Sequence, residues 1–459
     1  MRQRVTALLL MLALLASVCG VSALAEGPGG AQAGETPEAS GTAGEAEELE
    51  EAEAPEEAEA PEEPPSLAGP DLADMITLEP DALGQVSFAN VERRMRENNL
   101  QVLVLEQSVR TLEDIDYEKL HEDLRQQLTD IAKAQWQLVS TVDVLVAGGI
   151  MSTYDYHRSY EQLKQAYDAV RDTYESIEEG DMQRDNAGVI RQLNNLQDQI
   201  VVAGEALYVA VTAMETQERN LQRQLTALDR TVEEMGLRYR MGQISALQLT
   251  EVKAGRTALE SGLATLRMNI QNYKLQLEMM IGAEQTGEIA LGPVPEVTAA
   301  QLADMDLEAD LAAAKERSYE LYDAEKTLED ARDTYKDAAN NWGYNESRYE
   351  FRSARYAWQA AQYTYNSTVQ NYELKFRTLY AQVKDYYQVW EAAKVSRASQ
   401  KDSYAATELK YKQGTVSLNT LLSAEDDLRA KENAVVSAAG DLFSAYNSYC
   451  WAVRHGIIN

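Results

Sequence analysis

The stretch LRYRMGQISALQL (237–249) returns, at an offset of 172 residues, as LKYKQGTVSLNTL (409–421), and the two copies align without gaps. In each copy two basic residues precede a glycine, and a serine follows that glycine three positions later. Cations are favourable at a helix C-terminus, glycine accepts the positive φ that ends a helix, and serine is a good N-cap. Each copy therefore predicts a helix, a tight turn and a returning helix.

The helix predicted after each turn carries a seven-residue apolar rhythm. Alternating spacings of four and three, or a strict period of seven, are typical of helices that pack side by side as coiled coils. The first returning helix has this seam at Leu259, Leu263, Leu266, Ile270, Tyr273, Leu277 and Met280, and the second has it at Leu421, Leu428, Val435, Leu442 and Tyr449.

Proline placement allows these helices to be long. Eight of the ten prolines lie at or before Pro80, and the other two are Pro293 and Pro295. Because proline costs about 3 kcal/mol inside a helix, the stretches 81–292 and 296–459 can hold long helices. Residues 344–413 contain neither glycine nor proline, which allows roughly 100 Å of helix. The segment GEIALGPVPEV (287–297) reads as an extended connector, with room for a short strand.

Each half also opens in a similar way. Amphipathic segments at 87–109 and 306–328 are interrupted by polar breaks at Asn98-Asn99 and Arg317-Ser318. We predict an all-α fold of two tandem, long antiparallel coiled-coil hairpins, over 76–292 and 298–459, joined by a connector at 293–297. The first half is about 47 residues longer between equivalent points, which predicts extra helices there.

The N-terminus has the pattern of a secretory signal peptide. Arg2 and Arg4 precede an apolar run, and Ala23-Leu24-Ala25 supplies a small-residue cleavage site, so we predict a leader over 1–25. Cys19 leaves a lipoprotein signal as the alternative. Cleavage after Ala25 would leave Cys450 as the one cysteine, so packing rather than an internal disulfide would hold the exported chain.

Residues 26–75 form a predicted disordered linker. Fourteen glutamates lie between Glu26 and Glu63, with no lysine or arginine among them, and such a segment repels itself and has little to bury. It is a solvated spacer or an acidic tether. The whole chain carries 75 acidic and 42 basic residues, a net charge of −33, which argues against a nucleic-acid partner.

Signals for chemistry are lacking in the sequence. The three histidines are isolated and no nucleotide-binding, zinc or hydrolase motif occurs, so we predict a non-enzyme without cofactor or metal. Tyrosines at seven-residue spacing in the second half, including Tyr349, Tyr356 and Tyr363, predict packing between helices, with a substrate-facing lining as the alternative. No later run is long and apolar enough for a transmembrane helix.

The doubled R-Y-x-x-G and K-Y-x-x-G turns, the Glu97-Asn98-Asn99 opening and the heptad helices resemble the outer membrane efflux protein family of the TolC type over roughly 82–456. The resemblance implies a homotrimer whose helices close into a tube, and turns that meet a periplasmic adaptor coupled to an inner-membrane pump. The residues implied to face the adaptor are Tyr239, Met241, Gly242, Gln243, Tyr411, Gln413, Gly414 and Thr415.

Two departures from that family stand out. Its members insert membrane-spanning strands in each half; here only 139–149 is a candidate strand, and Leu138, Val142 and Leu145 fit a helix equally well, so we predict a reduced or absent barrel. Family members that are gated by an Asp–Arg network carry charged residues just after the turn glycines, and Gln248, Val416 and Thr420 occupy those positions here. The resulting hypothesis is a passive efflux or export conduit component in the outer membrane. The alternative is an envelope structural or interaction protein that conducts nothing.

Overall fold

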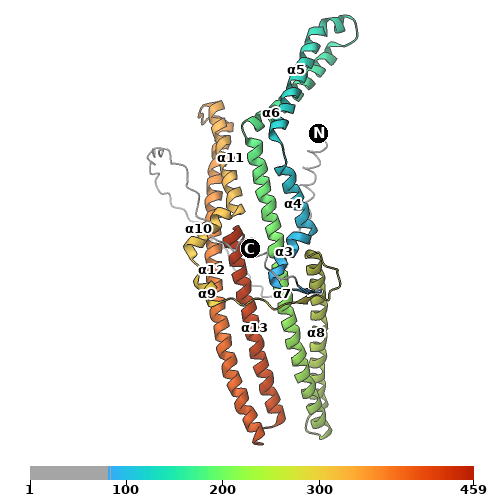
Figure 1. The fold of residues 1–459 in the computed structure, drawn as a ribbon, viewed down its shortest axis with the longest axis vertical. Coiled ribbons are helices and arrows are strands. Elements are labelled where there is room, and N and C mark those ends of the chain that lie inside the picture. The colour runs from blue at the N-terminus through green and yellow to red at the C-terminus, as the bar shows by residue number, and fades with distance from the viewer. Residues whose placement is uncertain (1–80, 83, 459) are drawn as a thin grey trace. The chain divides into compact units, whose positions relative to one another are not determined.

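A computed structural model describes residues 81–82 and 84–458 of the chain. The predicted signal peptide and acidic linker lie outside these residues. The all-α prediction is confirmed, because the described residues form eleven helices (Figure 1). The same residues also contain two short strands, β1 (Gln85–Val86) and β2 (Ala290–Leu291), which pair in parallel.

The first half is built around two long antiparallel helices, α7 and α8, with four shorter helices before them. Its helices are α3 (Phe88–Asn98), α4 (Leu100–Glu113), α5 (Tyr117–Ala147), α6 (Thr153–Glu178), α7 (Asp181–Arg240) and α8 (Ala246–Met280). The extra helices expected in this half are α5 and α6, which pack against each other as a hairpin between α4 and α7. The candidate strand 139–149 is helical in α5, and its turn follows at Gly148.

The second half repeats the long hairpin with fewer additions. Its helices are α9 (Ala299–Ala303), α10 (Leu307–Arg317), α11 (Tyr319–Trp342), α12 (Tyr349–Lys412) and α13 (Leu418–His455). The 64 residues of α12 correspond to about 96 Å of helix, close to the length that the sequence allowed. None of the helices described combines the length and hydropathy needed to cross a bilayer.

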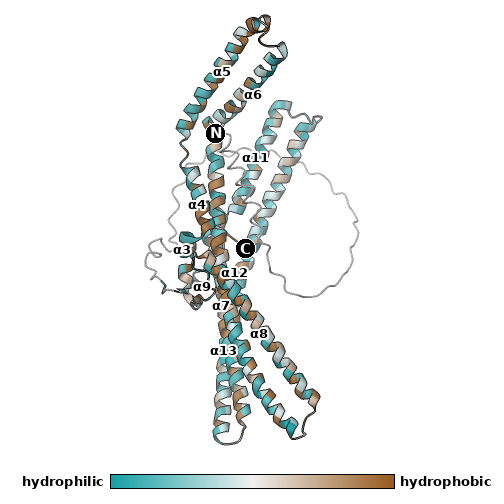
Figure 2. Cartoon of the chain, turned by 90° about the vertical axis from the view of Figure 1, so that its right-hand side faces the viewer, coloured by the Kyte–Doolittle hydropathy of each residue, from teal (hydrophilic) through white to brown (hydrophobic). Residues whose placement is uncertain are grey.

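The heptad seams lie where the two long hairpins close. Every seam position predicted on α8 and α13 is buried or half-buried, and α8 packs on α7 as α13 packs on α12. Hydrophilic and hydrophobic residues alternate along the long helices (Figure 2). This distribution is what a pair of coiled-coil helices requires.

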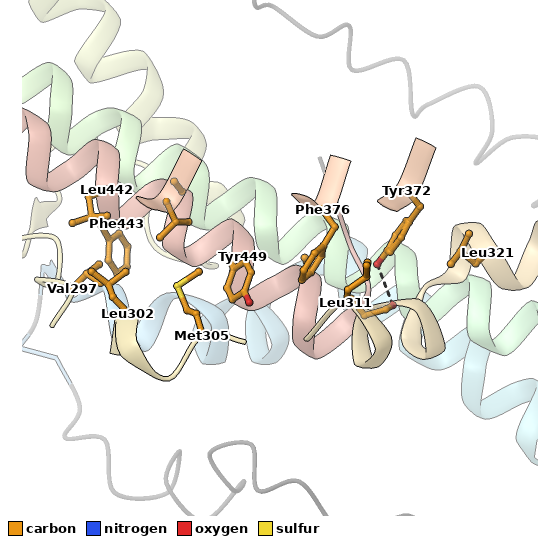
Figure 3. Close-up of a cluster of buried hydrophobic side chains, with 14 residues drawn as sticks. Val297, Leu302, Met305, Leu311, Leu321, Tyr372, Phe376, Leu442, Phe443 and Tyr449 are labelled. Atoms are coloured by element: carbon orange, nitrogen blue, oxygen red, sulfur yellow. Dashed lines mark hydrogen bonds between the residues drawn. The ribbon is translucent and has the colours of Figure 1, made fainter. Parts of the chain in front are cut away.

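The most buried side chains lie at the level where the short helices meet the long ones. One cluster joins α10, α12 and α13 to the segment 297–305 that precedes α10. It includes Leu311, Tyr372, Phe376 and Tyr449 (Figure 3). A second cluster joins α3, α7 and α8 around Met95, Tyr208 and Leu277.

The two polar breaks hold the ends of the returning helices. Asn99 caps α4 by accepting from the backbone N–H groups of Gln101 and Val102, and its Nδ2 donates to the carbonyl of Met280 at 2.9 Å. At the second break the Arg317 guanidinium donates to the carbonyl of Val453 at 3.1 Å. Both breaks therefore close the C-terminus of a long helix, which would otherwise leave carbonyls unpaired.

Replacing Tyr208 with phenylalanine should lower the free energy of unfolding by about 1–2 kcal/mol. The ring is fully buried, and its hydroxyl donates to the carbonyls of Val86 at 3.1 Å and Gly292 at 2.8 Å, which joins α7 to both strand segments. Urea denaturation followed by circular dichroism measures the loss. Tyr363→Phe, at an exposed site, is the control and should change nothing; equal losses in both variants would contradict the prediction.

Candidate docking site at the hairpin turns

The turn between α7 and α8 ends the first long helix with a left-handed glycine. Gly242 has φ of 71°, its N–H donates to the carbonyl of Tyr239 at 2.9 Å, and the N–H of Gln243 donates to that of Arg238 at 2.9 Å. This pair of bonds satisfies carbonyls at the helix end, as in a Schellman motif. Met241 is the C-cap residue of α7 and directly precedes Gly242.

The turn between α12 and α13 has the same geometry. Gly414 also has φ of 71°, its N–H donates to the carbonyl of Tyr411 at 2.8 Å, and the N–H of Thr415 donates to that of Lys410 at 3.0 Å. Gln413 occupies the position equivalent to Met241. The sequence repeat is thus a structural repeat at both turns.

Serine caps start both returning helices, as the sequence predicts. The hydroxyl of Ser245 accepts from the N–H of Gln248 at 3.2 Å, and the Gln248 side chain accepts from the N–H of Ser245 at 3.0 Å, which completes a capping box. The hydroxyl of Ser417 accepts from the N–H of Thr420 at 3.3 Å. Gln248 and Thr420 therefore take part in the N-caps of α8 and α13.

Both turns expose large apolar side chains. Leucine, tyrosine and methionine side chains here are between 38% and 68% exposed, although the same helices bury their seam residues. Exposed apolar groups gathered at one place are typical of a surface that binds another molecule. The set comprises Leu237, Tyr239, Met241 and Leu247 at the first turn, and Leu409, Tyr411 and Leu418 at the second.

Sequence reasoning did not include all of these residues in the site. Leu237, Leu247, Leu409 and Leu418 lie outside the predicted adaptor-facing set. The sequence could have indicated two of them. Leu247 and Leu418 each lie beside a turn but off the predicted heptad positions, where an apolar side chain has no expected partner within its hairpin.

Polar contacts hold the two turns near each other. Arg230 of α7 forms an ion pair with Asp426 of α13, and the Asn419 amide donates to the Glu234 carboxylate at 2.9 Å. The turns therefore lie at the same end of the two hairpins (Figure 1). The last turn of each incoming helix carries basic residues: Arg238 and Arg240 on α7, and Lys410 and Lys412 on α12. The arrangement suits non-covalent docking of a partner with apolar and acidic groups.

A second feature is a cavity of about 160 Å³ between α3, α7 and α13. Glu205 lines it and is 4% exposed; its carboxylate accepts hydrogen bonds from the Asn447 amide and the Trp451 indole, both at 2.7 Å. Burial raises the pKa of Glu205, and the two hydrogen bonds oppose that rise. The described residues contain no group of three side chains able to hold a metal ion.

Truncating Glu205 to alanine should cost about 2–4 kcal/mol of unfolding free energy, because it leaves the Trp451 and Asn447 donors unpaired in the interior. Glu205→Gln keeps an acceptor and should cost little. Because the pKa of Glu205 is raised in the folded chain, the folded chain binds more protons than the unfolded chain at pH values between the ordinary pKa and the raised one. The contribution of Glu205 to the free energy of unfolding therefore falls as pH rises through this range. Urea titrations across pH 4–8 should show a flatter profile for the glutamine variant. A loss in Glu205→Gln equal to that in Glu205→Ala would contradict this.

Comparison with known proteins gives structural likeness without a sequence match. No protein family and no curated protein matches the sequence. The chain is similar to the outer membrane protein VceC from Vibrio cholerae, with 16% identity, a TM-score of 0.42, and 59% of this chain and 74% of that chain covered. It is similar to a membrane protein from Pseudomonas aeruginosa, with 13% identity, a TM-score of 0.47, and 80% and 89% covered. It is also similar to the outer-membrane channel OprN, with 11% identity, a TM-score of 0.47, and 81% and 90% covered.

Proposed function

We propose that this chain is a component of an export or efflux conduit in the outer membrane of the cell envelope. It would assemble as a homotrimer and act passively, while a periplasmic adaptor docks at the hairpin turns and couples the conduit to an inner-membrane pump. The observation that carries the proposal is the pair of equivalent turns, each with a left-handed glycine and exposed apolar side chains, held at the same end of the two hairpins.

The chemistry of the turns supports docking rather than catalysis. Exposed leucine, tyrosine and methionine side chains lose contact with water when a partner covers them, and this provides a driving force for association. Neither turn holds a pair of titratable side chains arranged for proton transfer. A trimer would present three pairs of these turns to the adaptor.

A photo-crosslinking amino acid at Tyr239 or Tyr411 tests the docking. Whole cells are irradiated and crosslinked products are identified by mass spectrometry. We expect both positions to capture an envelope adaptor protein, whereas the control position Tyr363, which is 73% exposed on α12, should not. The purified full chain should have the mass of three copies by light scattering. A monomer without crosslinks at either turn would overturn the proposal.

The second candidate function, an envelope structural protein, predicts a different cellular result. Charged replacements at the turns, Met241→Glu together with Tyr411→Glu, should raise the accumulation of ethidium if the protein is a conduit. The matched replacement Tyr363→Glu should leave accumulation unchanged. If the turn variant loses its crosslinks while ethidium accumulation does not change, the structural alternative is favoured and the conduit is not.

A further inference from the structure

Both docking turns carry positive charge in a chain that is acidic as a whole. The segments 235–250 and 409–424 span the two turns, and together they contain four basic and no acidic side chains. The whole chain has 75 acidic and 42 basic residues and a net charge of −33. The turns therefore form a local region of opposite charge at one end of the two long hairpins.

One cation at each turn is neutralised within its own helix, and the other is not. Arg238 and Lys412 each form an ion pair with the glutamate four residues earlier on the same helix. A glycine and an alanine occupy that position for Arg240 and Lys410, so no pair can form there. Both of these side chains are exposed, and neither forms an ion pair or a hydrogen bond with any residue that the structure describes. Arg240 and Lys410 are therefore available to carboxylates of another molecule.

The preferences of helix ends do not account for the lack of acidic residues. A cation is favourable at a helix C-terminus, so α7 and α12 gain from their basic last turns. By the same rule an acidic residue is favourable in the first turn of a helix, and α5, α6, α7, α10, α11 and α12 each carry one. The returning helices α8 and α13, like α3, α4 and α9, carry none. Both turns thus stay positive where helix stability would favour a carboxylate.

The placement of apolar groups favours a protein partner over a lipid surface. Within the turns themselves, residues 241–245 and 413–417, Met241 is the one large apolar side chain that is exposed. The exposed leucine and tyrosine side chains lie on the flanking helices. Insertion into a bilayer requires an apolar face that enters first, whereas a protein surface can cover apolar flanks and pair with charges at their rim.

We propose that the hairpin turns select an acidic protein partner, with Arg240 and Lys410 as the residues that recognise its carboxylates. This inference rests on the proposed function, in which the partner is the periplasmic adaptor. Adaptor carboxylates would face the two cations while its apolar side chains cover Tyr239, Met241 and Tyr411. Complementary charge sets the orientation and the rate of an encounter more than its affinity. Because the rest of the chain is acidic and repels the same partner, the adaptor is directed to the turns.

Charge reversal combined with photo-crosslinking tests the proposal. The full chain carries a photo-crosslinking amino acid at Tyr239, and the partner segment that it captures in whole cells is identified by mass spectrometry. We expect that segment to contain more aspartate and glutamate than lysine and arginine. Arg240→Glu with Lys410→Glu should lower the crosslinking yield about tenfold, because like charges across an interface repel each other. Lysine in place of glutamate in the captured segment should restore the yield.

The matched control is Arg158→Glu with Lys164→Glu, which makes the same change in net charge at two exposed cations on α6. It should crosslink like the wild type, and circular dichroism should show equal helicity in all three proteins. Equal yields from the reversed variant and the control would overturn charge recognition and leave the adaptor docking intact. If the wild-type turns captured no adaptor, the docking itself would be overturned, and this inference with it.

Binding of the captured adaptor to the purified full chain gives a second readout. Raising the salt concentration from about 0.05 M to about 0.5 M should weaken wild-type binding roughly tenfold, because salt screens the attraction. The same change should strengthen binding of the reversed variant, because there salt screens a repulsion. Wild-type binding that did not respond to salt would overturn the proposal.

Vesicle flotation separates the lipid alternative from the protein partner. The probes are vesicles of three parts phosphatidylcholine to one part phosphatidylglycerol. We expect the wild type and the reversed variant to float equally poorly. Flotation that required Arg240 and Lys410, together with adaptor crosslinking that did not, would overturn the proposal, because the two cations would then recognise an anionic bilayer.

Discussion

Replacing Gly456 with alanine is expected to lower the free energy of unfolding by about 3–5 kcal/mol. Gly456 ends α13 with φ of 70°, a conformation that a residue with a Cβ adopts at a cost. A Cβ here would also lie 2.6 Å from the backbone carbon of Arg317, and inside van der Waals contact with the backbone of Ser318. Because those neighbours are backbone atoms in the break between α10 and α11, they cannot rotate away.

Two other glycines separate the conformational cost from the steric one. Gly414 has φ of 71° but nothing within 4 Å of an added Cβ, so Gly414→Ala should cost about 1–2 kcal/mol. Gly440 lies inside α13 with open space around it, so Gly440→Ala should stabilise by up to about 1 kcal/mol. Chemical denaturation of the three variants gives the order. If Gly456→Ala lowered the free energy of unfolding no more than Gly414→Ala does, close packing of α13 against the break between α10 and α11 would be contradicted.

The sequence was sufficient for the features that depend on local physics. The glycine turns at 242 and 414, the serine caps and the heptad seams were all predictable, because a left-handed residue, a cap and an apolar period act within one or two turns of helix. The polar breaks were predictable as interruptions for the same reason. The segment 139–149 was ambiguous, because a short apolar run fits a helix and a strand alike.

The partners of these features could not be predicted, because they come from distant parts of the chain. Asn99 donates to the carbonyl of Met280, 181 residues away, and Gly456 packs against Ser318. The tyrosine heptads show the same limit: Tyr372 is buried and donates to the carbonyls of Ala314 and Gly456, whereas Tyr363 is 73% exposed. Periodicity identifies a face of a helix but does not tell which neighbour covers it.

The same limit applies to the candidate site. The sequence repeat indicated both turns, but the ion pair of Arg230 with Asp426, which holds them at the same end, joins positions 196 residues apart. The buried Glu205 was also beyond prediction, since one glutamate among many on heptad-patterned helices has no local mark. Its donors come from α13, in the other half of the chain.

Glu278→Gln is expected to lower the free energy of unfolding by about 3 kcal/mol, although the two side chains have nearly the same shape. Glu278 is 1% exposed at the end of α8. One carboxylate oxygen accepts from the N–H groups of Thr286 and Gly287, both at 2.7 Å, and the other accepts from the N–H of Ile289 and the hydroxyl of Thr286, both at 3.1 Å. A glutamine amide would point its own N–H groups at two of these donors.

The matched control is Glu288→Gln, which removes an exposed carboxylate from the same connector and should change stability by less than about 0.5 kcal/mol. Hydrogen exchange at the amides of Gly287 and Ile289 gives a second, local readout, and it should accelerate only in Glu278→Gln. If the connector stayed protected in that variant, the carboxylate would not be what holds it to α8.

The pH dependence of stability gives an independent test of the same carboxylate. Burial alone would raise the pKa of Glu278, but the hydrogen bonds from Gly287, Ile289 and Thr286 outweigh burial and lower it. Because the folded pKa is depressed, the contribution of Glu278 is fully present above the ordinary pKa of a glutamate and is lost as pH falls through the folded value. Urea denaturation of the wild type and Glu278→Gln should therefore differ most near neutral pH and converge in acid. A difference that persisted unchanged into acid would show that the carboxylate's charge does not hold the connector between the two halves.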